Sequence, residues 1–187
     1  IRSSDEAYAY VTELRKLVRY LDICDGNMEE GSMRCDANVS VRLKGESAYR
    51  NRVEVKNMNS IRNVKRAIDN EVKRQIEIYD AGGTIDQETR GFNPADGSSF
   101  PLRSKENAHD YRYFPEPDLP PVVVTQQTIA EIKAKMPQLP KELQEKFIAE
   151  YKLSSYDAHV LTDERETALY FLELTRYTKQ YKVAANW

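Results

Sequence analysis

Hydrophobic and polar residues alternate strictly between residues 30 and 43, and this is the clearest pattern in the chain. Because successive side chains of a strand point to opposite faces of a sheet, the pattern predicts one long strand with a polar and an apolar face. The polar positions are Glu30, Ser32, Arg34, Asp36, Asn38, Ser40 and Arg42. Asp and Asn fit a pleated surface poorly, so their place in the middle of this face makes a chemical role a candidate interpretation. From the pattern alone an ordinary half-exposed strand is preferred, because alternation is its usual signature.

A second alternating segment, Arg52–Lys56, follows after a short run of turn residues. Antiparallel pairing of the two strands would place Asp36 and Glu54 on one polar surface, with Arg34 and Lys56 beside them. Such carboxylates are candidate ligands of Mg²⁺, which prefers carboxylate and water oxygens plus substrate phosphates, and the cations are candidate phosphate partners. The alternative is a ladder of cross-strand salt bridges, in which each pair contributes about 0.2–1 kcal/mol.

Two amphipathic helices are predicted next to these strands. Ser3 and Glu6 have the spacing of a capping box, and an apolar stripe with helical spacing follows them. Ser60 is a candidate cap for the second helix, and Gly82-Gly83 is its expected end. The expected core face of that helix consists of Ile61, Val64, Ile68, Val72, Ile76 and Tyr79. A helix N-terminus can approach an anion, which makes Ser60 a candidate for cofactor binding.

A β-hairpin is predicted from residues 84–92 and 98–103, because a loop rich in turn-forming residues separates them. Pro101 cannot donate a ladder hydrogen bond, so the second strand is expected at a sheet edge. Arg90 and Arg103 are candidates for covering a phosphate from this hairpin. Ordinary surface positions are the equal alternative for both.

The second half of the chain changes from strands and turns to helices. A catalytic role for His109 is not favoured, because no nucleophile motif accompanies it. The three aromatic residues that follow are interpreted as packing groups rather than as a base-stacking platform. Val122–Val124 is predicted to be a buried strand, and Thr128 with Glu131 has the spacing of another capping box. The predicted class is therefore α+β, with a mixed or antiparallel sheet and packed helices in residues 1–135, followed by the start of an all-helical domain in residues 136–187.

Composition sets only broad limits on function. The chain has 187 residues, 31% of them charged, and a net charge of −2, so no overall basic field marks it as a nucleic-acid binder. No membrane span or signal peptide is visible, which predicts a cytoplasmic protein without a membrane partner. The P-loop and Rossmann glycine patterns are missing, so phosphate chemistry would depend on the carboxylates and cations of the strands.

Four blocks of the sequence, in the same order, resemble the B-subunit family of the glutamyl/aspartyl-tRNA amidotransferases (GatB). The blocks are Met28–Arg42, Val53–Ser60, Gln87–Arg90 and Arg103–Pro121, and the terminal Val183–Trp187 also fits. The family's first strands, with a Gly-Leu-Glu-x-His motif, have no counterpart here, so an internal fragment is expected. By this resemblance, residues 1–135 are the C-terminal part of the catalytic cradle domain and residues 136–187 begin the helical domain.

The resemblance implies a specific activity. In this family the B subunit uses ATP and Mg²⁺ to phosphorylate the side-chain carboxylate of tRNA-bound Glu or Asp. Ammonia from an amidase (A) subunit then displaces the phosphate, in a heterotrimer completed by a small C subunit. Misacylated Glu-tRNA(Gln) thereby becomes Gln-tRNA(Gln), and Asp-tRNA(Asn) becomes Asn-tRNA(Asn). The isolated fragment is expected to be inactive.

The resemblance also makes the polar strand face part of the kinase pocket. The metal-ligand candidates are, in order, Glu54, Asp36 and Glu30. The catalytic candidates are Glu54, Asp36, Arg34 and Lys56, and the cofactor-binding candidates are Arg90, Arg103 and Ser60. The alternative is a non-catalytic module that docks tRNA or the other subunits and keeps only the scaffold.

Overall fold

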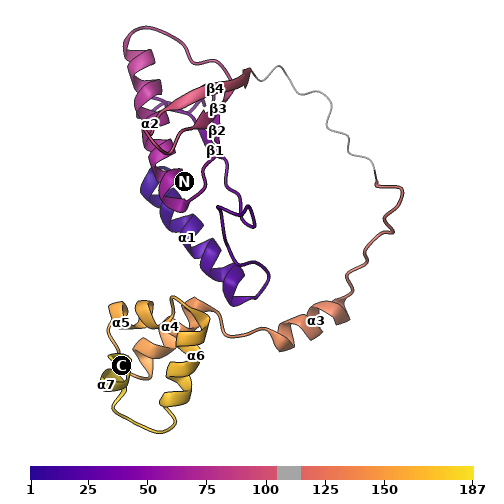
Figure 1. Ribbon diagram of the computed structural model, residues 1–187, viewed down its shortest axis with the longest axis vertical. Helices are drawn as coiled ribbons and strands as arrows, with labels where there is room; N and C mark the ends of the chain where they lie inside the picture. The colour runs from indigo at the N-terminus through magenta and orange to yellow at the C-terminus, as the bar shows by residue number, and fades with distance from the viewer. Residues whose placement is uncertain (105–114) are drawn as a thin grey trace. The chain divides into compact units, whose positions relative to one another are not determined.

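The computed structural model describes residues 1–104 and 115–187, and these residues form seven helices and one four-stranded sheet (Figure 1). Two compact units are present. The first contains Ile1–Thr12 and Asn27–Pro117, and the second contains Glu13–Gly26 and Asp118–Trp187. The α+β class predicted from the sequence is confirmed, because the sheet is mixed and helices accompany it.

The sheet of the first unit has the strand order β1-β2-β3-β4. The strands are β1 (Ala37–Val39), β2 (Val53–Lys56), β3 (Glu88–Phe92) and β4 (Ser99–Ser104). β1 pairs antiparallel with β2, as predicted, and β3 forms an antiparallel hairpin with β4, which lies at the edge. β2 and β3 are parallel, which requires a long crossover connection, and the helix α2 provides it.

The first strand is much shorter than the predicted span of residues 30–43. Asn27 turns the chain before it, since its Oδ1 accepts hydrogen bonds from the backbone N–H groups of Glu29 (3.0 Å) and Glu30 (3.3 Å). Gly31 then adopts a positive φ of 81°, which a glycine accepts without strain. These local hydrogen bonds compete with the sheet ladder, so the alternation before residue 37 belongs to a turn segment.

Helix α2 (Ile61–Asp80) covers one face of the sheet (Figure 1). Its Val64 and Ala67 and the β2 residues Val53 and Val55 are each at most 1% exposed and share one core. The Ser60 hydroxyl accepts a hydrogen bond from the Asn63 backbone N–H at 3.2 Å, so the predicted N-cap is confirmed.

The C-terminal end of α2 also follows the prediction. Gly82 has a φ of 78° and donates its N–H to the Tyr79 carbonyl at 3.0 Å. Gly83 donates to the Ile78 carbonyl at 2.9 Å, which completes a Schellman motif. Both ends of this helix are therefore set by residues within one turn of it.

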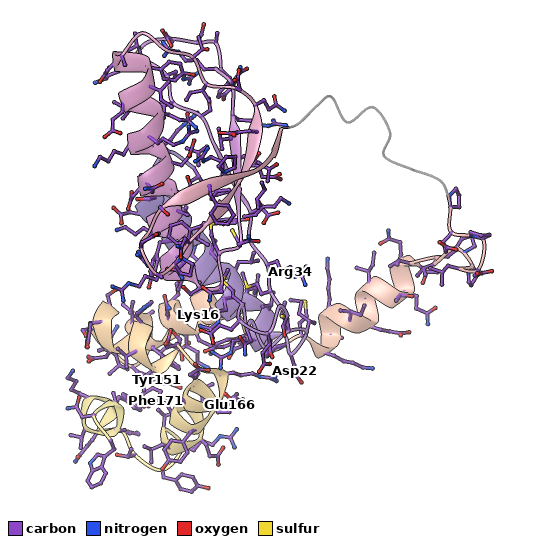
Figure 2. All side chains as sticks on the ribbon, turned by 45° about the horizontal axis from the view of Figure 1, so that its top comes forward. Lys16, Asp22, Arg34, Tyr151, Glu166 and Phe171 are labelled. Atoms are coloured by element: carbon purple, nitrogen blue, oxygen red, sulfur yellow. The ribbon has the colours of Figure 1, made fainter. Side chains whose placement is uncertain are left out.

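The second unit is built from helices. Its core is formed by α4 (Pro140–Ala149), α5 (Ser155–Leu161), α6 (Arg165–Leu174) and α7 (Tyr181–Ala185), together with the end of α1 (Ser4–Tyr20). Phe147 and Phe171 are 0% and 2% exposed, and their ring centroids are 4.9 Å apart. Tyr151 stacks on Phe147 in the same core and meets the Phe171 ring edge-on. Tyr151 and Phe171 are labelled in Figure 2.

The prediction of a buried strand at residues 122–124 is wrong. Val122, Val123 and Val124 are 89%, 79% and 61% exposed, and no strand forms there. Helix α3 (Gln126–Lys135) follows, with no buried residue, and Thr125 rather than Thr128 is its cap.

The compact units divide the chain at 117/118 and give residues 13–26 to the second unit, whereas the domain boundary at 135/136 stays a prediction.

Candidate functional site

One row of polar residues crosses the sheet. The strand register places Asn38 beside Glu54, Glu54 beside Thr89, and Thr89 beside the backbone of Arg103. Laterally paired residues share a face of the sheet, so Asn38, Glu54 and Thr89 lie on the side opposite to α2. The parallel pairing of β2 and β3 brings Thr89 into this row. Neither this pairing nor the place of Thr89 was predicted from the sequence. The strand–helix–strand order at residues 53–92 was the available signal, because such a unit favours parallel pairing.

Two carboxylates of this face converge on one ammonium group. The Lys56 Nζ lies 2.9 Å from Asp36 Oδ2 and 3.7 Å from Glu54 Oε1. Thr89, which is 1% exposed, donates its hydroxyl hydrogen to Glu54 Oε2 at 3.1 Å. Only 15% of the Glu54 side chain is exposed, whereas 44% of the Asp36 side chain is. The structure therefore brings together three of the predicted site residues and holds Glu54 in a fixed orientation.

The donor set of Asp36 and Glu54 fits a divalent cation such as Mg²⁺. Both carboxylates already face one cationic group, and Mg²⁺ is commonly held by one or two carboxylates with substrate phosphates and water completing its shell. Within the described parts of the chain, no group of three or more acidic, histidine or cysteine side chains could hold a metal. A metal here would therefore be held by these two residues and by oxygens from a ligand.

Glu30 and Arg34, the other candidates from this segment, lie in the turn before β1 rather than on the strand. Arg34 folds back over Gly31, because a Cβ atom added to Gly31 would lie 3.4 Å from its guanidinium (Arg34 is labelled in Figure 2). The metal-binding role of Glu30 and the catalytic role of Arg34 stay predictions.

The three cofactor-binding candidates lie in different places. Ser60 caps α2. Arg90 faces α2 instead of the polar row, and its side chain is 12% exposed. Its guanidinium donates to Glu88 Oε1 at 2.8 Å and to the Ser99 hydroxyl and carbonyl at 2.9 and 2.8 Å. The side chain of Arg103 lies outside the described residues, as does His109. A phosphate-binding role stays a prediction for Ser60, Arg90 and Arg103.

A buried polar network on the α2 side of the sheet was not predicted. Glu71 and Gln75 are both 0% exposed, and they hydrogen-bond to each other at 2.7 Å. Gln75 also donates to the Val39 carbonyl and accepts from the Val41 N–H, both at 3.0 Å, while Glu71 accepts two hydrogen bonds of 2.8 Å from Arg74. Apolar periodicity cannot find these residues, because they are polar groups inside a core.

A hollow of about 560 Å³ opens on the polar side of the first unit. Its lining consists of Ile1, Arg2, Asn38, Ser40, Tyr49, Arg50, Asn51, Arg52 and Gln87. Two contacts fix the wall, since Ser40 Oγ donates to the Arg50 carbonyl at 3.0 Å and Asn51 Nδ2 donates to the Ile85 carbonyl at 2.8 Å. Most of these residues lie in the loops that flank the strands, where alternation gives no signal.

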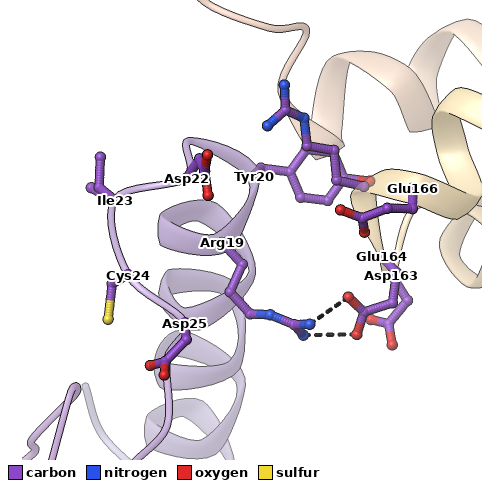
Figure 3. A pocket seen from close by; sticks show the side chains of 10 residues that line it. Arg19, Tyr20, Asp22, Ile23, Cys24, Asp25, Asp163, Glu164 and Glu166 are labelled. Carbon is purple, nitrogen blue, oxygen red and sulfur yellow. Dashed lines mark hydrogen bonds and ion pairs between the residues drawn. The ribbon is translucent and has the colours of Figure 1, made fainter.

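A second hollow, of about 400 Å³, lies in the second unit (Figure 3). Figure 3 shows the Arg19 guanidinium bonded to Glu164 through two contacts of 2.7 Å. The Tyr20 hydroxyl donates to the Thr162 carbonyl at 2.8 Å, and buried Lys16 pairs with Asp163 at 3.2 Å. These contacts tie the end of α1 to the start of α6, which is a structural role.

Comparison with known proteins finds one family model that covers most of the chain. The family model described as "GatB/GatE catalytic domain" matches residues 1–130, which include all four strands of the sheet. No helix in the described part of the chain is long and apolar enough to cross a membrane.

Curated relatives match along the entire chain. The B subunit of the aspartyl/glutamyl-tRNA(Asn/Gln) amidotransferase of Ectopseudomonas mendocina is 51% identical over all 187 residues. The proteins of the same name from Pelodictyon phaeoclathratiforme and Paramagnetospirillum magneticum are 53% and 52% identical over the same span. The chain covers 39%, 39% and 38% of the length of these three relatives.

Proposed function

Because the chain belongs to the GatB/GatE catalytic-domain family, we propose that it is part of the B subunit of an aminoacyl-tRNA amidotransferase. The match over residues 1–130 carries this proposal, and the identity of about one half over the whole chain supports it. The proposed reaction converts Glu-tRNA(Gln) to Gln-tRNA(Gln) and Asp-tRNA(Asn) to Asn-tRNA(Asn) in the cytoplasm. The proposed partners are an amidase A subunit, a small C subunit and the misacylated tRNA.

The proposed step of this chain is the phosphorylation of the aminoacyl carboxylate by Mg-ATP. A carboxylate oxygen of the tRNA-bound residue attacks the γ-phosphorus of ATP and ADP leaves. Ammonia from the A subunit then attacks the carbonyl carbon, and inorganic phosphate leaves as the amide forms. Phosphoryl transfer depends mainly on positioning and on charge neutralisation, so a face with fixed carboxylates and a cation suits it.

Four residues on the polar face of the sheet have a defined part in this proposal. Asp36 and Glu54 would hold Mg²⁺, which when bound neutralises the charge of the phosphates. Thr89 keeps the Glu54 carboxylate in place through its 3.1 Å hydrogen bond. Lys56 holds the two carboxylates near each other, and its positive charge would attract a phosphate oxygen on the same face.

The variant Glu54→Gln in the complete enzyme tests the proposal. Because the substitution removes a charge from the proposed phosphoryl-transfer site, it should slow glutamine-dependent amidation of Glu-tRNA(Gln) by on the order of 10²-fold or more. Glutamine hydrolysis by the A subunit should persist. Glu77→Gln is the matched control, because Glu77 lies on α2 with 64% of its side chain exposed.

Amidation at the wild-type rate by a folded Glu54→Gln enzyme would contradict the proposal. It would favour the alternative, a module that docks tRNA or the other subunits without taking part in the chemistry.

A further inference from the structure

We infer that the hollow beside the polar row binds backbone phosphates near the acceptor end of the aminoacyl-tRNA. This inference rests on the proposed function and adds a substrate subsite to it. It concerns the approach of the RNA strand, whereas the proposed function concerns the chemistry at Glu54.

The charge of the hollow points to an anion. The hollow is lined by Arg2, Arg50 and Arg52, and no acidic residue of the described chain lines it. This local charge is positive, although the chain as a whole carries a net charge of −2. Arg50 is already engaged, because Glu46 pairs with its guanidinium at 2.7 Å and the centre of the Tyr79 ring lies 4.6 Å from it. Arg52 is exposed and has no hydrogen bond or ion pair with the described residues, so its five N–H donors are available.

The polar groups around Arg52 match a nucleotide strand. Asn38 and Gln87, which carry side-chain amides, line the hollow. Tyr49 also lines it, and 75% of the Tyr49 surface is exposed to solvent. The Arg42 guanidinium lies 4.7 Å from the Tyr49 ring centre, which steadies one face of the ring. Arginine and amide side chains are common partners of RNA phosphates and sugars, and an exposed aromatic ring provides a platform for a base.

The position of the hollow connects it with the proposed site. Asn38 lines the hollow and is also the cross-strand neighbour of Glu54. Arg52 directly precedes β2 and lies two residues before Glu54, which in an extended chain corresponds to a distance of about 7 Å. An RNA strand held at Arg52 would therefore bring its 3′ end towards the carboxylates of the polar row.

An RNA strand fits this hollow better than free ATP does. A small-molecule site usually encloses most of the ligand surface and is mainly apolar. Here the lining is mostly polar, and the aromatic residue faces solvent. We therefore assign the phosphates to the tRNA strand.

Steady-state kinetics of the complete enzyme with Arg52→Gln test the inference. The variant should raise KM for Glu-tRNA(Gln) by about tenfold and lower the slope of log KM against log salt concentration by about 0.7, because one phosphate contact is lost. KM for ATP should stay within about twofold of the wild-type value. Arg62→Gln, an exposed arginine on α2, removes the same charge and should change neither constant.

Two further variants check the chemistry of the contact. Arg52→Lys keeps the charge and should recover most of the affinity for tRNA. Tyr49→Ala should raise KM for tRNA by about tenfold, while Tyr49→Phe, which keeps the ring, should not.

If Arg52→Gln raised KM for ATP and left KM for tRNA unchanged, the inference would be overturned, and the hollow would be assigned to the phosphates of ATP. Unchanged constants for both substrates in Arg52→Gln and Tyr49→Ala would overturn it as well. Either result leaves the requirement for Glu54 in amidation intact, whereas failure of the proposed function appears as full activity of Glu54→Gln.

Discussion

Single residues of this protein gain their roles from partners that lie far away in the sequence. Asp36 lies directly before β1 and next to the pair Ala37–Val55, so the antiparallel pairing of β1 and β2 brings it to Lys56, and this contact could be predicted from the sequence. Thr89 reaches Glu54 only through the parallel strand pair, and Tyr20 reaches Thr162 across more than a hundred residues. Such contacts have no local signature, which is why the sequence did not reveal them.

Tyr20 provides a prediction on alkaline stability. It is 1% exposed, and its burial, with the nearby charges of Asp163, Glu164 and Glu166, raises its pKa to about 12. In the unfolded chain the phenol titrates near its usual value of about 10, so between pH 10 and 12 the unfolded state loses the proton first. The free energy of unfolding should therefore fall as the pH rises through this interval, by up to about 2–3 kcal/mol from this group.

Urea denaturation at pH 9, 10 and 11, followed by helical circular dichroism, measures this effect. Tyr20→Phe lacks the titrating hydroxyl, so its stability should be lower at pH 9 but less dependent on pH above 10. Equal pH dependence in the two proteins would show that Tyr20 does not contribute.

At the scale of elements, the sequence predicts helices better than strands. The ends of α2 were predicted from Ser60 and Gly82-Gly83 because their hydrogen bonds are made within a turn. The start of β1 was predicted too early because the side chain of Asn27 turns the chain before the ladder begins. The hairpin was predicted from its loop, whereas the apolar run at Val122–Val124 finds no partner strand among the described residues.

Gln75 connects two elements and should be sensitive to substitution. Its amide bonds to the Val39 carbonyl, the Val41 N–H and Glu71. Gln75→Leu would remove the side-chain partner of the Val39 carbonyl and the Val41 N–H, whereas Glu71 would keep its hydrogen bonds with Arg74. Each unsatisfied group costs about 1–3 kcal/mol, and we expect a loss of at least about 2 kcal/mol in the free energy of unfolding.

Chemical denaturation against a matched control measures this loss. Gln127→Leu makes the same change on the exposed helix α3 and should cost less than about 0.5 kcal/mol. A similar, small effect of both substitutions would mean that Gln75 is not needed to hold β1 to α2.

At the scale of the whole molecule, the segment that precedes α4 has little support of its own. Residues 116–128 are exposed throughout, and α3 has no buried residue. Helices with few buried contacts open easily. Limited trypsin digestion should therefore cut between Lys135 and Lys141 faster than within α2 or within α4–α7, as mass spectrometry of the fragments would show. Earlier cleavage inside α4–α7 would contradict the compactness of the second unit.

The central claim is that the polar face of the sheet takes part in phosphoryl transfer. The most direct measurement is the single-turnover transfer of labelled γ-phosphate from ATP to Glu-tRNA(Gln) by the complete enzyme without glutamine or ammonia. Asp36→Asn and Glu54→Gln should each slow the transfer by on the order of 10²-fold or more, while Glu77→Gln should match the wild-type enzyme. Wild-type transfer rates in folded Asp36→Asn and Glu54→Gln enzymes would contradict the claim and leave the face as a structural ladder of salt bridges.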